Sequence, residues 1–157
     1  MRIGFGYDSH RFDAARPLIL GGVRIEGAPG LAGHSDGDAI AHAVTDALLG
    51  ATALGDIGRH FPPSDSRWKD ADSIDLLRRA VALLKAEGYA IGNVDVTVVT
   101  ERVRIAPHAL SMREALAAAL DIPVSAVSVK GKTNEGMGWT GEGVGLAAYA
   151  VALVRTT

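Results

Sequence analysis

Side chains that can bind a metal gather in the first third of the chain. Asp8 and His10 are two residues apart, so on a strand both side chains project to the same side. If a helix that carries His42 packs beside that strand, two imidazoles and one carboxylate converge. Such a set suits Zn²⁺ and leaves a fourth coordination position open, which is typical of a catalytic zinc site. The alternative is that these three groups lie on the surface and never meet.

A second polar segment, Lys130-Gly131-Lys132-Thr133-Asn134-Glu135, has features of a phosphate site. It is not a Walker A loop, because that motif needs glycine at the position of Ala126. A lysine, a hydroxyl and free backbone amides still suit an anion, and Glu135 could share a divalent cation with a diphosphate. The alternative is a polar turn with a salt-bridged lysine.

Weaker signals lie elsewhere in the chain. In Gly55-Asp56-Ile57-Gly58 the glycines suggest close backbone approach to a ligand, although a helix C-cap explains Gly55 equally well. Trp139 lies in a Gly-rich stretch and is either a stacking platform or part of the core. His60 and His108 have no partner in view, so both are interpreted as structural.

Hydrophobic periodicity predicts the elements that position these groups. Residues 1–10 alternate as a strand, and the segment 36–54 has helical spacing. The same patterns, with cap and turn residues, predict a hairpin over 18–25 turning at Gly21-Gly22, helices over 72–88 and 107–120, strands over 94–100, 127–129 and 144–154, and loops over 27–37, 55–69, 101–106 and 131–143.

The helix predicted over 36–54 has an apolar and a polar side. Its apolar stripe is formed by Ile40, Val44, Ala47, Leu48 and Ala51. His42 lies roughly 180° away, with Asp38 one turn before it and Asp46 one turn after it. Either aspartate could accept the second ring N–H of His42 and orient the ring. Leu49 shares this side, so it is either exposed or covered by another subunit.

The segment 144–154 is apolar at both odd and even positions. This pattern favours a strand that is covered on both faces. Helices can cover one face, but a small domain has few elements left for the other. The second cover is therefore expected from another subunit.

Composition limits the class of protein. The 157 residues suit one domain, and 48% hydrophobic residues are enough for a core. A net charge of −2 argues against a general nucleic-acid binder. The absence of cysteine excludes disulfides, thiolate metal ligands and a cysteine nucleophile. With no signal peptide and no apolar run of about 18 residues, a cytoplasmic protein without a membrane partner is expected.

The motifs that carry a family resemblance, in chain order, are Asp8-Ser9-His10, His34-Ser35-Asp36-Gly37-Asp38, His42, Thr45-Asp46-Ala47-Leu48-Leu49-Gly50, Gly55-Asp56-Ile57-Gly58, Phe61-Pro62, Asn93-Val94-Asp95, Pro107-His108, Met112-Arg113, Val129-Lys130 and Thr133-Asn134-Glu135. Together they resemble the 2-C-methyl-D-erythritol 2,4-cyclodiphosphate synthase family of the non-mevalonate isoprenoid pathway. The resemblance covers essentially the whole chain, and the stretches at 34–38 and 55–58 are its most specific part.

The resemblance implies a phosphorus-oxygen lyase. Its substrate would be 4-diphosphocytidyl-2-C-methyl-D-erythritol 2-phosphate. The 2-phosphate attacks the β-phosphorus, CMP leaves, and 2-C-methyl-D-erythritol 2,4-cyclodiphosphate forms. The resemblance also implies one α+β domain over 1–157, with a mixed sheet, helices packed on one face, and sheets that face the axis of a homotrimer. Each active site would lie between adjacent protomers.

The matching positions imply a role for each site residue. Asp8, His10 and His42 would hold one zinc per chain, and Glu135 would bind Mg²⁺ or Mn²⁺ on the diphosphate. His34 and Thr133 match catalytic positions, and Thr133 would steady the transferred phosphoryl group. Besides these residues, the implied substrate contacts are Ser35, Asp56, Gly58, Lys132 and a cytosine pocket formed by Thr100, Glu101, Arg102, Val103, Arg104, Ile105 and Ala106.

Some positions depart from the family pattern. Glu142 and Val144 stand where many members have arginine and glutamate, so no isoprenoid diphosphate is expected on the trimer axis. Pro63 replaces an aspartate of some members, and Lys132 replaces a common threonine and adds a positive charge. Two rival functions are a zinc phosphohydrolase of nucleotides and a trimeric binding protein without turnover.

Overall fold

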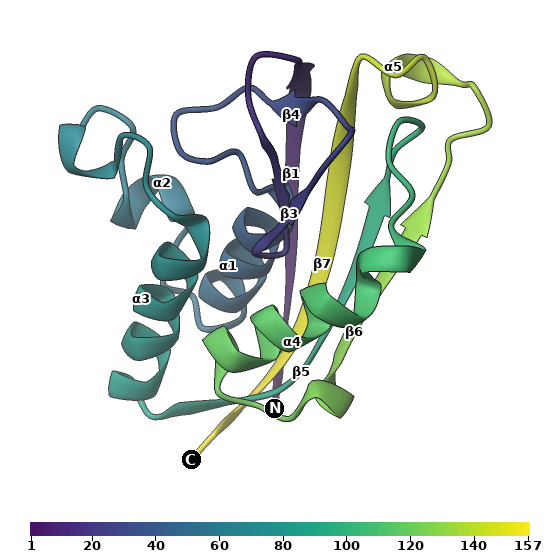
Figure 1. Cartoon of the computed structure of the whole chain (residues 1–157). Coiled ribbons are helices and arrows are strands. Elements are labelled where there is room, and N and C mark those ends of the chain that lie inside the picture. The colour runs from purple at the N-terminus through teal and green to yellow at the C-terminus, as the bar shows by residue number, and fades with distance from the viewer.

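A mixed five-stranded sheet forms the centre of the computed structural model, which describes residues 1–157. The strands of the chain are β1 (Arg2–Asp13), β2 (Leu18–Leu20), β3 (Val23–Ile25), β4 (Gly30–Leu31), β5 (Tyr89–Val99), β6 (Val127–Lys132) and β7 (Gly145–Thr156). The sheet has the order β4-β1-β7-β5-β6 (Figure 1), and β2 and β3 form a separate hairpin. Within the sheet only β5 and β6 are parallel, and the other neighbours are antiparallel.

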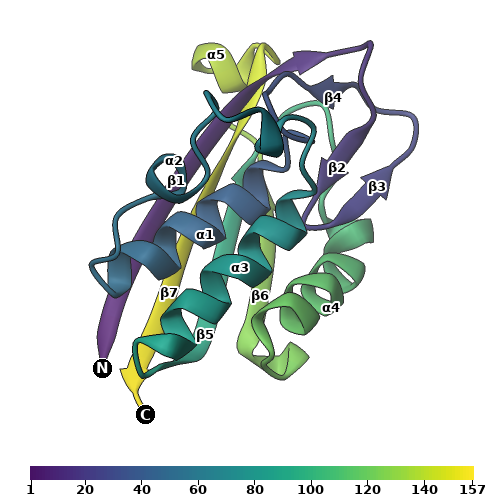
Figure 2. The same ribbon diagram turned by 90° about the vertical axis from the view of Figure 1, so that its left-hand side faces the viewer.

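The long helices α1 (Ala39–Ala51), α3 (Ser73–Ala86) and α4 (Ala109–Leu120) all lie on one face of the sheet, as Figure 2 shows. α1 packs on β1 and β7, α4 packs on β6, and α3 packs on both α1 and α4. The shorter elements are α2 (Ile57–His60), α5 (Gly138–Gly141) and 3-10 turns at Ser66–Trp68, Ala106–His108 and Val124–Ala126. The prediction of a single-domain α+β fold, with helices on one face of a mixed sheet, is confirmed.

The predicted elements are present, but several bounds differ. β1 and β5 are longer than predicted, because pairing with their neighbours extends β1 to Asp13 and begins β5 at Tyr89. The first helix begins after Asp38, whose carboxylate accepts a hydrogen bond from the Ala41 amide. Pro107 lies in a 3-10 turn that precedes α4, not in its first turn. The predicted loops contain β4, α2 and α5, which are too short to give a periodic signal.

β1 and α1 approach each other closely because β1 presents two glycines to the helix. A Cβ added to Gly4 would lie 1.8 Å from the carbonyl oxygen of Ala47, and one added to Gly6 would lie 1.8 Å from that of Ala43. No side chain can occupy that space unless the helix moves. The two glycines therefore set the distance between the helix and the strand.

The same side of β1 carries Asp8 and His10, because side chains alternate along a strand. α1 carries His42 one helical turn before Asp46. With α1 seated on the glycines, His42 comes within hydrogen-bond distance of Asp8. The close packing of α1 on β1 thus assembles the predicted metal group.

The opposite face of the sheet is left open by a single chain. Its exposed apolar side chains include Ile3 and Phe5, which are 73% and 62% exposed. The remaining members are Tyr7 on β1 and Tyr149 and Val151 on β7. The β7 side chains that face the helices are buried, namely Leu146, Ala148, Ala150, Ala152 and Val154. One chain therefore covers only one face of its C-terminal strand, as the sequence predicted.

The interpretation of Leu49 was wrong in both of its forms. Leu49 is fully buried within the single chain, so it is neither exposed nor a sign of a covering subunit. The reason is that α1 lies between the sheet and α3, so that only His42, Asp46 and Gly50 escape full burial along the helix. The prediction assumed that this helix has one buried and one exposed side, whereas α1 is buried on almost every side.

Gly6→Ala tests the packing of α1 on β1. The new methyl group would collide with the Ala43 carbonyl, so we expect the free energy of unfolding to fall by about 3 kcal/mol. The measurement is urea denaturation followed by circular dichroism at one protein concentration.

Gly50→Ala is the matched control, because the nearest atom to its new Cβ is 4.0 Å away and the residue lies in α1. It should be neutral or stabilise the protein by about 0.5–1 kcal/mol. Equal stability of the two variants would contradict the packing argument.

Candidate metal centre and ligand cavities

The predicted metal ligands meet in the structure. One carboxylate oxygen of Asp8, Oδ2, lies 2.7 Å from His10 Nε2 and 2.9 Å from His42 Nδ1. The two ring nitrogens are 3.4 Å apart, and the three ligand atoms all lie within 4.8 Å of one another. The alternative of three surface groups that never meet is excluded.

Each histidine ring also has an oxygen partner on its other nitrogen. His10 Nδ1 donates to the carbonyl oxygen of Ala32 over 2.6 Å. His42 Nε2 lies 2.8 Å from Ser73 Oγ and 3.1 Å from Ser35 Oγ. Histidines that bind metals usually make such an outer contact, which leaves the inner nitrogen free for the ion. Both rings therefore fit a metal centre.

The electrostatics of the group also suit a cation. Burial raises the pKa of Asp8, but hydrogen bonds from His10 and His42 and their charges outweigh it and lower this pKa to about 2. For His10, burial lowers the pKa, whereas the hydrogen bond and charge of Asp8 raise it above its usual value. A divalent ion would replace the protons on His10 Nε2 and His42 Nδ1, the ring nitrogens that face Asp8.

Asp38 and Asp46 do not orient His42, so that prediction was wrong. Asp38 is fully buried and accepts hydrogen bonds from the backbone amides of Gly21, Gly22 and Ala41. Asp46 accepts from the Ile57 amide at the start of α2, over 2.8 Å. Both carboxylates thus hold neighbouring backbone in place, and Ser73 and Ser35 contact the His42 ring instead.

A cavity of about 280 Å³ opens beside the metal group. It is lined by His10 and His42 together with the predicted substrate contacts His34, Ser35 and Gly58. The predicted Asp56 is next to this wall, where its carboxylate caps α2 by accepting from the Arg59 amide over 2.8 Å. Residues from two segments of the chain, His34-Ser35 and Ile57-Gly58, therefore line one cavity with His42.

Sequence reasoning missed the aromatic wall of this metal-side cavity. Phe61 and Trp68 both line it, with ring centroids 5.1 Å apart and nearly perpendicular planes. Pro63 lines it as well. Two aromatic residues within a proline-containing loop, in a chain with only 5% aromatics, were the available signal.

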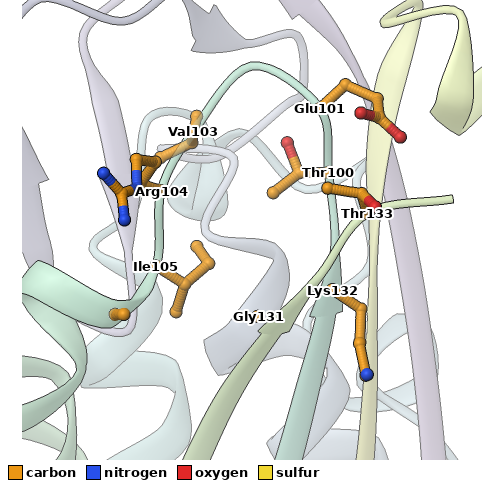
Figure 3. A pocket seen from close by; sticks show the side chains of 9 residues that line it. Thr100, Glu101, Val103, Arg104, Ile105, Gly131, Lys132 and Thr133 are labelled. Carbon is orange, nitrogen blue, oxygen red and sulfur yellow. The ribbon is translucent and has the colours of Figure 1, made fainter. Parts of the chain in front are cut away.

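A second cavity, of about 230 Å³, joins the two other predicted segments (Figure 3). Its lining consists of Thr100, Glu101, Val103, Arg104, Ile105, Ala106, Gly131, Lys132 and Thr133. The absence of a side chain at Gly131 lets β6 approach the 100–106 segment, because a Cβ there would lie 2.8 Å from the Ile105 side chain. Arg102 is the exception among the predicted residues, since its guanidinium lies over the Phe12 ring.

The loop after β6 is connected to this second cavity by hydrogen bonds. We call it the nucleotide-side cavity, because the family resemblance implies that its residues contact cytidine. The Asn134 amide donates to Glu101 over 2.7 Å, and Thr133 Oγ1 donates to Glu135 over 3.1 Å. Lys130 forms an ion pair with Asp95, as in the polar-turn alternative. Lys132 lines the cavity, although Figure 3 shows its ammonium group extending away from Arg104 and Ile105.

The metal-side and nucleotide-side cavities have no lining residue in common. His10, His42, His34 and Ser35 line the first cavity, and Lys132, Thr133 and the 100–106 segment without Arg102 line the second. Within one chain, the site residues are thus brought together as two separate groups.

The structure also locates three weaker sequence signals. His60 Nε2 donates to the Leu54 carbonyl oxygen over 2.8 Å, which supports its structural interpretation. Gly55 has a φ of +96°, but α1 ends at Ala51, so Gly55 is not its C-cap. Trp139 is 43% exposed and therefore lies outside the core.

Comparison with known proteins now decides the family. The model of the YgbB family matches residues 1–155. The chain belongs to the YgbB family. A curated relative from Xanthomonas oryzae pv. oryzae, named 2-C-methyl-D-erythritol 2,4-cyclodiphosphate synthase, is 54% identical over 153 residues, which are 98% of this chain and 94% of the relative. This YgbB protein is accordingly an enzyme, a synthase of the non-mevalonate isoprenoid pathway.

Solved structures of similar proteins share the whole fold. The bifunctional IspDF from Campylobacter jejuni matches with a TM-score of 0.96 and 36% identity over 99% of this chain, which spans only 42% of that longer protein. A CDP-bound 2C-methyl-D-erythritol-2,4-cyclodiphosphate synthase matches with a TM-score of 0.90 and 38% identity, covering 98% of this chain and 100% of the other. No helix of the YgbB chain is both long and apolar enough to cross a bilayer.

His42→Ala tests the metal group. The wild-type protein should bind about one Zn²⁺ per chain, and the variant should lose most of it because one of three ligands is gone. The measurement is elemental analysis after dialysis, with circular dichroism to verify folding. His108→Ala, which lies outside the group, should keep the wild-type content. Full zinc occupancy in His42→Ala would contradict the ligand assignment.

Proposed function

We propose that residues 1–157 form one cyclodiphosphate-synthase domain that converts 4-diphosphocytidyl-2-C-methyl-D-erythritol 2-phosphate into 2-C-methyl-D-erythritol 2,4-cyclodiphosphate and CMP. The observation that carries this proposal is the convergence of Asp8, His10 and His42 at the edge of a cavity that also contains His34 and Ser35. The name of the relatives at 54% identity supports the same reaction.

The metal-side cavity would bind the phosphorylated methylerythritol end of the substrate. Asp8, His10 and His42 would hold one Zn²⁺, which supplies Lewis-acid stabilisation of a β-phosphate oxygen. His34 and Ser35 would hold the 2-phosphate end, and Asp56 and Gly58 would contact the erythritol hydroxyls. The apolar wall around Phe61 and Trp68 would exclude water from this end of the substrate.

The nucleotide-side cavity would bind the cytidine and its phosphates. The 100–106 segment would contact cytosine, largely through its main chain. Thr133 and Lys132 would contact the phosphates, and Glu135 would bind Mg²⁺ or Mn²⁺ beside them, because hard cations prefer carboxylate and phosphate oxygens. The hydrogen bond from Thr133 to Glu135 supports a shared role for these two residues.

The reaction forms one P–O bond and breaks another. An oxygen of the 2-phosphate attacks the β-phosphorus, and the bond from that phosphorus to the bridging oxygen breaks, so CMP leaves with the electron pair. The nucleophile is already an anion, so no protein base is required. The protein contributes positioning and neutralisation of charge, as in other phosphoryl transfers.

We further propose that a homotrimer completes each active site. The metal-side and nucleotide-side cavities are separate in one chain, and the substrate must reach both. The open apolar face with Ile3, Phe5 and Tyr149 needs a cover that the single chain lacks. In a trimer, these faces would meet around the axis, and each metal group would face the nucleotide-side cavity of a neighbouring copy.

Product analysis tests the proposed reaction. The purified protein, loaded with Zn²⁺ and Mg²⁺, should turn the substrate into CMP and the cyclic diphosphate, as seen by phosphorus NMR. Hydrolysed products would indicate the nucleotide phosphohydrolase, and unchanged substrate would indicate a binding protein without turnover.

Glu135→Gln tests the role of the loop after β6. Loss of one electrostatic stabiliser should cost roughly 2.7–4 kcal/mol in the transition state, a fall in turnover of about 10²- to 10³-fold. The Mg²⁺ needed for half-maximal rate should rise, and the zinc content should stay the same. The measurement is steady-state kinetics against Mg²⁺ at fixed Zn²⁺. Glu142→Gln is the control and should behave as wild type; the same behaviour in Glu135→Gln would refute the assignment.

Light scattering tests the assembly. The mass should be about three times 16.3 kDa, because the family resemblance implies a homotrimer and the open apolar face needs a cover. Phe5→Asp should dissociate the trimer, because it places a charge on the open apolar face. Leu110→Asp is the matched control: Leu110 is 58% exposed on α4, on the helix side, and its variant should stay trimeric. A monomeric wild-type protein at micromolar concentration would contradict the proposal.

A further inference from the structure

A chain of polar side chains holds the ring nitrogen of His42 that faces away from the metal group. His42 Nε2 lies 2.8 Å from Ser73 Oγ, and Ser73 Oγ donates in turn to Asp36 Oδ1. The other oxygen of Asp36 accepts from the Ser73 amide over 3.0 Å. Ser73 is fully buried at the first turn of α3, so water does not compete for its hydroxyl.

The Asp36 carboxylate, at the end of this series of hydrogen bonds, sets the direction of each of them. A carboxylate only accepts hydrogen bonds, so the hydroxyl proton of Ser73 points at Asp36. Ser73 Oγ can then only accept from His42, which requires a proton on His42 Nε2. A neutral imidazole carries one N–H, so Nδ1 is left bare. Nδ1 is the atom that faces Asp8 and His10.

We infer that Ser73 and Asp36 are positioning residues that select the metal-binding tautomer of His42 and fix its ring orientation. The inference deepens the proposed function and rests on it, because it concerns the same metal group. His10 receives the equivalent constraint from the Ala32 carbonyl, which is main chain. His42 is therefore the ligand whose orientation depends on other side chains.

Ser35 offers a second hydroxyl near the same nitrogen, but it is the weaker partner. Ser35 Oγ lies 3.1 Å from His42 Nε2, against 2.8 Å for Ser73 Oγ. No carboxylate accepts the Ser35 proton, so the direction of this hydrogen bond is not fixed. Ser35 contacts the ring without deciding its tautomer.

Asp36 also joins the loop that carries His34 and Ser35 to the start of α3. Its amide donates to the Ala71 carbonyl over 3.2 Å, and its carboxylate accepts from both the Ser73 and the Asp38 amides. A change at Asp36 would therefore loosen the loop as well as the ring. Ser73→Ala is the sharper variant, because it removes only the hydroxyl.

Zinc affinity measured by competition with a chromophoric chelator tests the inference. Ser73→Ala should bind Zn²⁺ about 10- to 100-fold more weakly than wild type, as expected for loss of the partner of a metal-bound histidine. Asp72→Ala is the matched control, because Asp72 caps the same helix by accepting from the Ile74 amide and leaves the Ser73 hydroxyl in place. Its zinc affinity should stay close to wild type.

Nitrogen NMR of histidine-labelled, zinc-free protein at alkaline pH gives a second readout that loss of helix stability would not change. Wild-type His42 should show one neutral tautomer, with the proton on Nε2 and a bare Nδ1, and Ser73→Ala should show a mixture of the two neutral tautomers. Wild-type zinc affinity in Ser73→Ala, or an equal loss of zinc affinity in Asp72→Ala, would overturn this inference and leave the proposed metal centre standing. Failure of the wild-type protein to bind Zn²⁺ would overturn the inference and the proposed metal centre together.

Discussion

The contact between α1 and the glycine side of β1 is the constraint on which the rest of the structure depends. Gly4 and Gly6 let the helix backbone touch the strand, and this contact brings His42 to Asp8 and His10. It also divides the sheet into a helix-covered face and an open face. The metal group and the unpaired apolar surface are therefore two consequences of one packing arrangement.

Hydrogen bonds between distant segments then lock this arrangement. Asp38 joins α1 to the β2–β3 turn, and Asp46 joins it to α2. Asp36 and Ser73 connect the 33–38 loop to α3 and to the ring of His42. The acidic residues around the metal group thus act mainly as acceptors for backbone and hydroxyl donors, while Asp8 alone remains directed at the ligand position.

Strand alternation and helical spacing placed Asp8 with His10 on one side of a strand and His42 on one side of a helix, because both periodicities are local. That the strand and the helix meet was a condition of the prediction, and the structure fulfils it. The long strands and helices followed from the same periodicities. The roles of Asp38, Asp46 and Leu49 were wrong because they assumed that α1 has a solvent side, whereas the sheet and α3 enclose it. Ser73 was predicted only as part of the helix over 72–88, since its contact with His42 spans 31 residues. Non-local contacts of this kind leave no periodic signal.

In the assembly that we propose, one copy supplies the metal ligands and a neighbouring copy supplies the nucleotide-side cavity. Co-expression of His42→Ala and Glu135→Gln chains with different tags, followed by purification through both tags, yields only mixed trimers. In any mixed trimer one of the three sites combines two intact halves, so the activity should be about one third of wild type, whereas either variant alone should be nearly inactive. Mixed trimers no more active than the two single-variant trimers would show that each site lies within one chain and would contradict this account.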